Sequence, residues 1–141
     1  MTEHVSETVR TYVAADSSLR DVLDFIEEQL QQHGAGFKET MAVTVAAEEI
    51  FVNIAHYAYE GKTGEAEVTV RFEGNDIVVS MTDSGVAFNP LLREEPDIKA
   101  EAAERDIGGL GILMVRRTMD ECHYERINNK NVFTMRKAVI K

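Results

Sequence analysis

The chain has 141 residues, and its 15 Lys and Arg against 25 Asp and Glu give a formal net charge of -10 at pH 7. A chain of this length is normally one domain with a core large enough to fold alone, so we expect a single domain over residues 1–141. The negative charge disfavours nucleic acid as the main partner. No apolar run reaches transmembrane length, so no membrane association is expected. The single Cys122 excludes an internal disulfide. Without a secretory pattern at the N-terminus, these features predict a cytoplasmic protein.

The first segment of the chain predicts a strand followed by a helix. Residues 8–14 carry a β-branched residue at every second position, which is typical of a strand. Asp16, Ser17 or Ser18 can cap the following helix, and Gly34 ends it. The apolar residues that set its helical spacing are Leu19, Val22, Leu23, Ile26 and Leu30.

A second helix is predicted from Phe37 to about Ala58, and it carries polar residues within an otherwise apolar, buried stretch. Glu49 and Asn53 are four residues apart, so they return to nearly the same face, about 6 Å apart along the helix axis. His56 extends this polar stripe. Burying an unpaired carboxylate or amide is costly, which indicates that the chain uses these groups. Their chemistry suits a proton acceptor and a hard cation.

Two strands joined by a tight turn are predicted next. Residues 66–72 alternate between apolar and polar types, so this strand has one dry and one wet face. A hairpin turn is predicted at 73–76. In the second strand, Asp83 shares one face with the apolar residues Ile77, Val79 and Met81. Asp83 is therefore expected to point toward the core at the end of its strand.

The C-terminal half predicts an irregular segment, a helix and a hairpin. Residues 86–107 form a long irregular segment, which in a compact domain is usually a functional lid or disordered. The part at 97–106 fits a short acidic helix. The closing elements are a helix over 109–120 and a hairpin over 121–127 and 132–140. The order β-α-α-β-β-lid-α-β-β predicts an α+β fold, a two-layer α/β sandwich with helices on one face of a mixed, mainly antiparallel sheet.

Three motifs in chain order resemble the N, G1 and G2 boxes of the histidine-kinase-like ATPases, which have the Bergerat ATP-binding fold. They are Glu-x-x-x-Asn at 49–53 with Ala-Tyr close behind, Asp-x-Gly-x-x-Phe-Asn-Pro at 83–90, and Gly-Gly-Leu-Gly-Ile at 108–112. Within that family, the motif sequences are most similar to those of bacterial anti-sigma factors that are also serine-protein kinases. The resemblance covers roughly residues 8 to 138. One box alone is a weak signal, whereas three at domain-scale spacing predict ATP binding.

The resemblance implies a role for each polar residue of the first two motifs. Asp83 would accept the exocyclic N–H of adenine, Asn53 would offer its carbonyl oxygen to Mg²⁺, and Glu49 would be the general base. Gly85 would let the backbone approach the base without a Cβ clash. From the residues alone, other roles stay open: a turn-capping Asp83, an Asn53 hydrogen-bonded within the core, and a Glu49 that only orients Asn53. Glu48 lies about 100° round the helix and is the weaker candidate.

The glycine run lies at a predicted helix start, where free N–H groups and the helix dipole make an anion site. No Gly-Lys-Ser/Thr follows and no βαβ unit surrounds it, so it is neither a P-loop nor a Rossmann turn. Arg105 could meet the terminal phosphate on lid closure, or pair with a nearby glutamate. A hinge for the lid is the alternative role for the run. By resemblance, the residues that contact the phosphates are Gly108, Gly109, Leu110 and Gly111.

The last hairpin departs from the family pattern. Relatives often carry a glycine there, and then a threonine that helps to hold adenine through water. Here Lys130 stands near the expected glycine and Val132 near the expected hydroxyl. Thr134 is on the same strand face as Val132 and could substitute for it.

The sequence thus predicts an ATP-dependent protein-serine kinase and anti-sigma factor in a partner-switching circuit, with ATP and Mg²⁺ as cofactors. By resemblance, it would phosphorylate a serine of a STAS-type anti-sigma factor antagonist and bind a sigma factor or another effector. Relatives often form homodimers. The alternative is a nucleotide-dependent module that sequesters a partner with little or no transfer activity.

Overall fold

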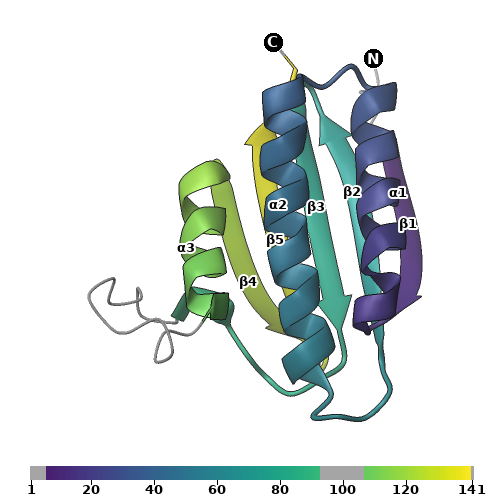
Figure 1. The fold of residues 1–141 in the computed structure, drawn as a ribbon, viewed down its shortest axis with the longest axis vertical. Coiled ribbons are helices and arrows are strands. Elements are labelled where there is room, and N and C mark those ends of the chain that lie inside the picture. Colours follow the sequence, from purple (N-terminus) through teal and green to yellow (C-terminus); the bar gives the residue numbers. More distant parts are fainter. Residues whose placement is uncertain (1–5, 93–106, 141) are drawn as a thin grey trace.

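The computed structural model describes residues 6–92 and 107–140. These residues form five strands and three α-helices (Figure 1). None of the helices in the described part of the chain is long and apolar enough to cross a membrane. The elements are β1 Ser6–Val13, α1 Leu19–Gln32, α2 Phe37–Asn53, β2 Glu65–Glu73, β3 Asp76–Asp83, α3 Ile107–Thr118, β4 Glu121–Ile127 and β5 Lys130–Ala138.

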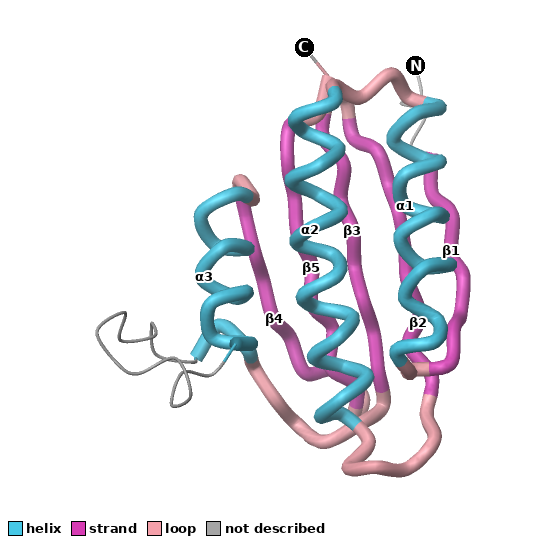
Figure 2. Tube along the Cα trace, in the orientation of Figure 1, coloured by secondary structure: helices cyan, strands magenta, loops and turns pink. Residues whose placement is uncertain are grey.

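The five strands form one sheet in the order β1-β2-β3-β5-β4, and all four pairings are antiparallel. The three helices cover one face of this sheet, with α2 between α1 and α3 (Figure 1). Figure 2 shows that β3 and α2 run down to the same end of the molecule, opposite the two chain termini. The predicted two-layer α+β arrangement is confirmed, except that the sheet of the described strands is wholly antiparallel and not mixed. The arrangement brings the C-terminal ends of α2 and β3 together.

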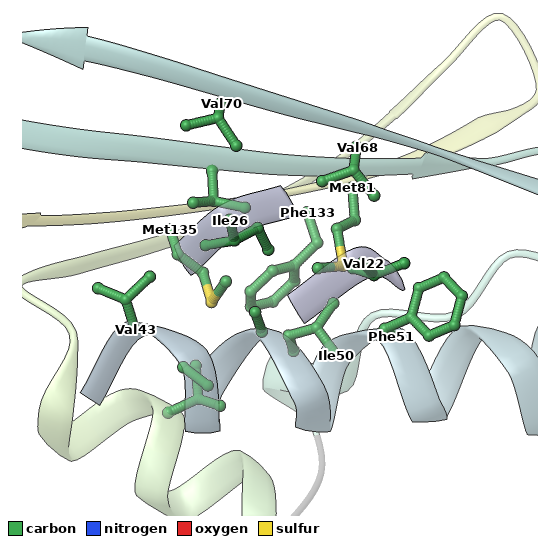
Figure 3. Close-up of a cluster of buried hydrophobic side chains, with 14 of the residues drawn as sticks. Val22, Ile26, Val43, Ile50, Phe51, Val68, Val70, Met81, Phe133 and Met135 are labelled. Atoms are coloured by element: carbon green, nitrogen blue, oxygen red, sulfur yellow. The ribbon is translucent and has the colours of Figure 1, made fainter. Parts of the chain in front are cut away.

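The core lies between the helices and the sheet. The inward face of β2 follows the predicted alternation, because Ala66, Val68, Val70 and Phe72 are buried. Burying one such aliphatic or aromatic side chain contributes roughly 1.5–3 kcal/mol, so this interface dominates stability. Figure 3 shows the meeting side chains, which include Val22, Ile26, Val43, Ile50, Phe51, Val68, Val70, Met81, Phe133 and Met135.

The start of α1 differs from the predicted capping. Ser18 occupies the N-cap position but makes no side-chain capping hydrogen bond. The Asp16 carboxylate lies 2.8 Å from Nε2 of His56, a partner 40 residues along the chain. The predicted end of the helix is confirmed, because Gly34 has a φ of +74°, which glycine adopts at no steric cost.

The second helix is neither uniformly buried nor uniformly α-helical. Phe37 is 83% exposed and Met41 is 50% exposed, so the expectation of a buried stretch is wrong for its first turns. The α-helix ends at Asn53 and continues as a π-helix over Ile54–Ala58. The wider π-helical turn changes the direction of the side chains after Asn53. This explains why His56 leaves the polar stripe and reaches Asp16.

The closing hairpin turns on two residues, a shorter turn than the predicted strands 121–127 and 132–140 allow. Asn128 and Asn129 have φ values of 52° and 63°, the left-handed pair that a two-residue turn of this kind requires. The strand β5 therefore begins at Lys130, two residues earlier than expected. In the predicted lid, Pro90–Leu92 form a 3-10 turn, and the predicted acidic helix at 97–106 lies outside the described residues.

Candidate functional site

A mainly apolar pocket opens where the end of α2, the end of β3 and the start of β5 meet. Its polar members are Asn53, Asp83 and Asn131, which are the buried polar side chains at this end of the molecule. Pockets of this kind, apolar with a few convergent polar groups, are the usual form of small-molecule sites. The remaining lining residues are Ile50, Ile54, Ala58, Met81, Val86, Phe88, Pro90, Tyr124 and Phe133.

Asp83 is the carboxylate of this pocket. It is the last residue of β3 and is 5% exposed, which confirms the inward orientation predicted from strand parity. Its Oδ1 accepts hydrogen bonds from the Gly85 backbone N–H at 2.9 Å and from Nδ2 of Asn131 at 3.0 Å. Both bonds compensate the cost of burying a charge.

Asn131 is the site residue that the sequence reasoning missed. It is 6% exposed and lies directly opposite Asp83 in the β3–β5 pairing. A signal was present in the sequence, because Asn131 has the same strand parity as Phe133 and Met135, which are both buried. The family pattern points instead to the neighbouring positions, Lys130 and Val132.

Glu49 and Asn53 meet as their spacing predicted. Nδ2 of Asn53 donates a hydrogen bond to Oε1 of Glu49 at 3.2 Å. Asn53 is 6% exposed and lines the apolar pocket, whereas Glu49 is half-buried beside it. Glu48 is exposed, in agreement with its place about 100° round the helix.

The glycine run is the start of α3. The helix begins at Ile107, so Gly108, Gly109 and Leu110 provide backbone N–H groups of its first turn. The first four N–H groups of a helix have no partner within the helix. A Cβ at Gly111 would lie 1.9 Å from Cδ of Glu49, so the absence of a side chain there lets α3 close on the Glu49 carboxylate.

A second hollow lies between α2 and α3, beside Glu49. It is lined by Val45, Ala46, Glu48, Glu49, Gly111, Met114, Val115 and Thr118. Glu49 therefore belongs to this groove, while its hydrogen-bond partner Asn53 belongs to the apolar pocket. The Glu49–Asn53 pair connects the two hollows.

Gly85 is required by a contact with the end of the π-helix. A Cβ at this position would lie 2.1 Å from the backbone oxygen of Ala58, which is itself hydrogen-bonded by the Val86 N–H at 2.8 Å. The close approach of the Gly85 backbone to the base stays a prediction, whereas the contact that requires glycine in the structure is with Ala58. Tyr59 adds to this junction, since its hydroxyl accepts the Ser84 N–H at 2.9 Å and donates to the Glu65 carbonyl.

One further candidate, Thr134, lies away from the pocket. The suggested substitute Thr134 hydrogen-bonds to Ser80 at 3.0 Å on the sheet face opposite Phe133, so it does not reach the pocket, and the suggestion is wrong. Strand alternation is the reason, because Thr134 and Asn131 point to opposite faces. Arg105 lies outside the described residues.

Asn53 is the described residue that fits a magnesium ligand. Its hydrogen bond to Glu49 uses the amide N–H, which leaves the carbonyl oxygen as a hard donor at the pocket wall. Mg²⁺ in nucleotide sites takes few protein ligands and completes its shell with phosphate oxygens and water. Within the described residues, no three His, Cys, Asp or Glu side chains cluster as a metal site.

The chain belongs to the family described as the histidine kinase-like ATPase domain, whose pattern matches residues 12–137. The matched residues include all those that line the apolar pocket and the groove between α2 and α3. Membership of an ATPase family implies that the chain binds ATP.

The chain is also similar to one curated protein and to solved structures. The chain is 22% identical over 131 residues to the serine/threonine-protein kinase BtrW of Bordetella bronchiseptica, and the match covers 92% of each chain. Its fold is similar to a solved structure of the RsbU and RsbW domains of Rv1364c from Mycobacterium tuberculosis, with a TM-score of 0.68 and 17% identity. That likeness covers 95% of this chain, which spans 32% of the other. The catalytic domain of the histidine kinase ThkA matches with a TM-score of 0.49, 16% identity, 99% of this chain and 100% of that chain.

Proposed function

We propose that this protein is an ATP-dependent protein-serine kinase, with adenine in the apolar pocket and the acceptor serine in the groove between α2 and α3. The observation that carries the proposal is the Glu49–Asn53 hydrogen bond of 3.2 Å. It joins a residue of the pocket to a carboxylate of the groove. A kinase needs this arrangement, because the transferred phosphoryl group must lie between the nucleotide and the acceptor.

The base-binding half of the proposal rests on Asp83. A carboxylate is a hydrogen-bond acceptor with no donor, so it favours a base that presents an exocyclic N–H, as adenine does. The apolar side chains around it, such as Met81 and Phe133, suit the faces of an aromatic base. Hydrogen bonds to charged groups contribute about 1.5–3 kcal/mol, so Asp83 would supply much of the selectivity.

The phosphate-binding half of the proposal rests on α3 and Asn53. The free N–H groups of Gly108, Gly109 and Leu110 and the positive end of the helix dipole favour an anion at the start of α3. Asn53 would hold Mg²⁺ through its carbonyl oxygen. Bound Mg²⁺ would neutralise part of the phosphate charge.

The transfer step rests on Glu49. The carboxylate would accept the proton of the serine hydroxyl while that oxygen bonds to the γ-phosphorus, and ADP would leave with the electrons of the broken P–O bond. Asn53 orients Glu49 through their hydrogen bond. Gly111 leaves room for the carboxylate at the wall of the groove.

The similarity to BtrW, which is named a serine/threonine-protein kinase, supports a protein acceptor. By resemblance, the acceptor would be a STAS-type antagonist in a partner-switching circuit, with a sigma factor or another effector as the alternative partner. The rival function is a nucleotide-dependent module that sequesters a partner without phosphorylating it. The placement of Glu49 in an open groove beside Asn53 favours the kinase.

The test of nucleotide binding is a calorimetric titration of Mg-ATP into the wild type and Asp83→Asn. The substitution keeps the size of the side chain but replaces the charged acceptor by an amide. We expect the affinity for Mg-ATP to fall by about tenfold or more, because the variant loses one hydrogen bond to a charged acceptor. Equal affinity in the two proteins would overturn the adenine assignment.

The test of transfer compares Glu49→Ala with Glu48→Ala on the same helix turn. Phosphorylation of a STAS-type protein substrate should fall by roughly 10²-fold or more in Glu49→Ala, since a general base contributes about 10²–10⁴-fold. Glu48 lines the same groove but lies about 100° round the helix from Glu49, so Glu48→Ala should lose far less activity than Glu49→Ala. A wild type that binds Mg-ATP but transfers no phosphate would instead support the sequestering module.

A further inference from the structure

Asn131 makes hydrogen bonds with every polar group of its carboxamide. Its Nδ2 donates to Oδ1 of Asp83 at 3.0 Å and to the Val86 carbonyl at 2.7 Å. Its Oδ1 accepts from the Phe88 backbone N–H at 3.3 Å and from the Tyr124 hydroxyl. An asparagine side chain has two N–H donors and two acceptor sites, so all four are used. Asn131 therefore has no remaining polar group for a ligand, although it lines the pocket.

These bonds determine which oxygen of Asp83 is left for a ligand. Oδ1 receives both the Asn131 amide and the Gly85 N–H. Within residues 6–92 and 107–140, the hydrogen bonds that Asp83 accepts through its side chain are both on Oδ1, so Oδ2 accepts none from this part of the chain. The two donors on Oδ1 thus fix the rotation of the carboxylate and leave Oδ2 as the acceptor for the pocket.

The same carboxamide fixes the chain that leaves β3. Val86 and Phe88 both line the pocket, and both are tied by their backbone to Asn131 on β5. Arg126 adds a bond from Nη1 to the Gly85 carbonyl at 2.9 Å. Residues 85–88 are therefore attached to the β4–β5 hairpin by side chains, beyond the end of the β3–β5 ladder.

We propose that Asn131 is a positioning residue for base recognition, which holds Asp83 with one oxygen toward the nucleotide and shapes the pocket wall at 85–88. It acts through Asp83 and does not itself bond to the base. This inference rests on the proposed function, because it requires Asp83 to contact the base. It also explains how this chain forms the pocket although Lys130 and Val132 replace the residues expected in its last hairpin.

A double-mutant cycle tests the inference with Asp83→Asn, Asn131→Leu and the combined variant. Leucine keeps the number and branching of the side-chain heavy atoms of asparagine but removes all four hydrogen bonds. We expect Asn131→Leu to weaken Mg-ATP binding by about tenfold or more, because the carboxylate loses its fixed orientation. The combined variant should weaken binding by clearly less than the product of the two single effects, since residues that act through one another are not additive.

The second measurement compares ATP with purine riboside triphosphate, which lacks the exocyclic amine. The wild type should prefer ATP, and Asn131→Leu should lose most of that preference. A purely structural role would lower stability and leave the preference unchanged. Thr134→Val is the matched control, because it removes a β5 hydrogen bond, at 3.0 Å to Ser80, on the opposite sheet face. It should bind both nucleotides as the wild type does.

The outcomes separate the two proposals. If Asp83→Asn binds ATP normally, the adenine assignment fails, and the inference fails with it. If Asp83→Asn weakens binding but the Asn131 effect is additive or absent, only the inference is wrong. Should Asn131→Leu fail to fold, Tyr124→Phe removes a single bond to the same carboxamide. That variant should weaken ATP binding by about twofold to fivefold and show the same non-additivity with Asp83→Asn; unchanged binding would overturn the inference.

Discussion

At the scale of single residues, the contact between Gly111 and Glu49 allows a test that separates stability from catalysis. A Cβ at Gly111 would lie within 2.3 Å of the carboxyl carbon and both oxygens of Glu49. These atoms form the end of a flexible side chain, so Gly111→Ala should displace Glu49 and keep the fold. Alanine also favours a helix by about 1 kcal/mol over glycine. We expect an unchanged or higher melting temperature together with at least about tenfold slower phosphate transfer.

Gly85→Ala is the contrasting variant for the same assay. Its Cβ would meet the backbone oxygen and carbon of Ala58 at 2.1 and 2.5 Å, and backbone atoms cannot move aside as a side chain can. A lower melting temperature is expected, with loss of nucleotide binding. Full transfer activity in Gly111→Ala would show that the position of the Glu49 carboxylate does not matter for the reaction.

At the scale of elements, Cys122 reports how α3 packs on β4. Its Sγ lies 3.9 Å from the Val115 carbonyl of α3. Burial raises the pKa of the Cys122 thiol to about 11, and the positive charge of Arg116 opposes that rise in part. Between about pH 8.5 and pH 11, the Cys122 thiol therefore stays mainly protonated, whereas an exposed cysteine is mainly thiolate. Near pH 8.5, iodoacetamide should alkylate the native protein on the order of 100-fold more slowly than the unfolded protein.

The same pKa gives a sign for the dependence of stability on pH. The folded pKa is raised above the unfolded value, so the folded state holds the proton more tightly. This contribution is fully present below the unfolded pKa, about 8.5 for cysteine, and is lost as pH rises toward about 11. Between these values the melting temperature should fall more steeply in the wild type than in Cys122→Ala. Parallel curves, or rapid alkylation of the native thiol, would indicate that α3 does not stay packed on β4.

At the scale of the whole molecule, the sequence predicted most of the architecture because periodicity reports burial directly. The alternation in β2 and β3 placed Asp83 inward, and the four-residue spacing placed Glu49 beside Asn53. The errors arose where tertiary contacts override local pattern. The π-helix after Asn53 redirected His56, which local spacing does not encode. Asn131 was missed because its importance comes from pairing with Asp83, 48 residues earlier in the chain.

The arrangement of the site predicts that nucleotide binding stabilises the entire described fold. The pocket and the groove take residues from α2, α3, β3 and β5, which all pack in one sheet-and-helix unit. A ligand at 100 times its Kd stabilises the state that binds it by about 2.7 kcal/mol. For a domain of this size, that corresponds to a rise in melting temperature on the order of 8 °C.

Differential scanning calorimetry of the wild type with increasing Mg-ATP checks this prediction. A single transition should move upward with concentration, because ligand contacts on both sides of α2 couple the elements. Asp83→Asn should shift less at equal ligand concentration, whereas Thr134→Val should shift as the wild type does, since Thr134 bonds on the opposite sheet face. Two separate transitions, with only one moved by Mg-ATP, would mean that α3 and its glycine run unfold independently of the base pocket. The proposed link through Glu49 and Asn53 would then be too weak to join nucleotide binding to transfer.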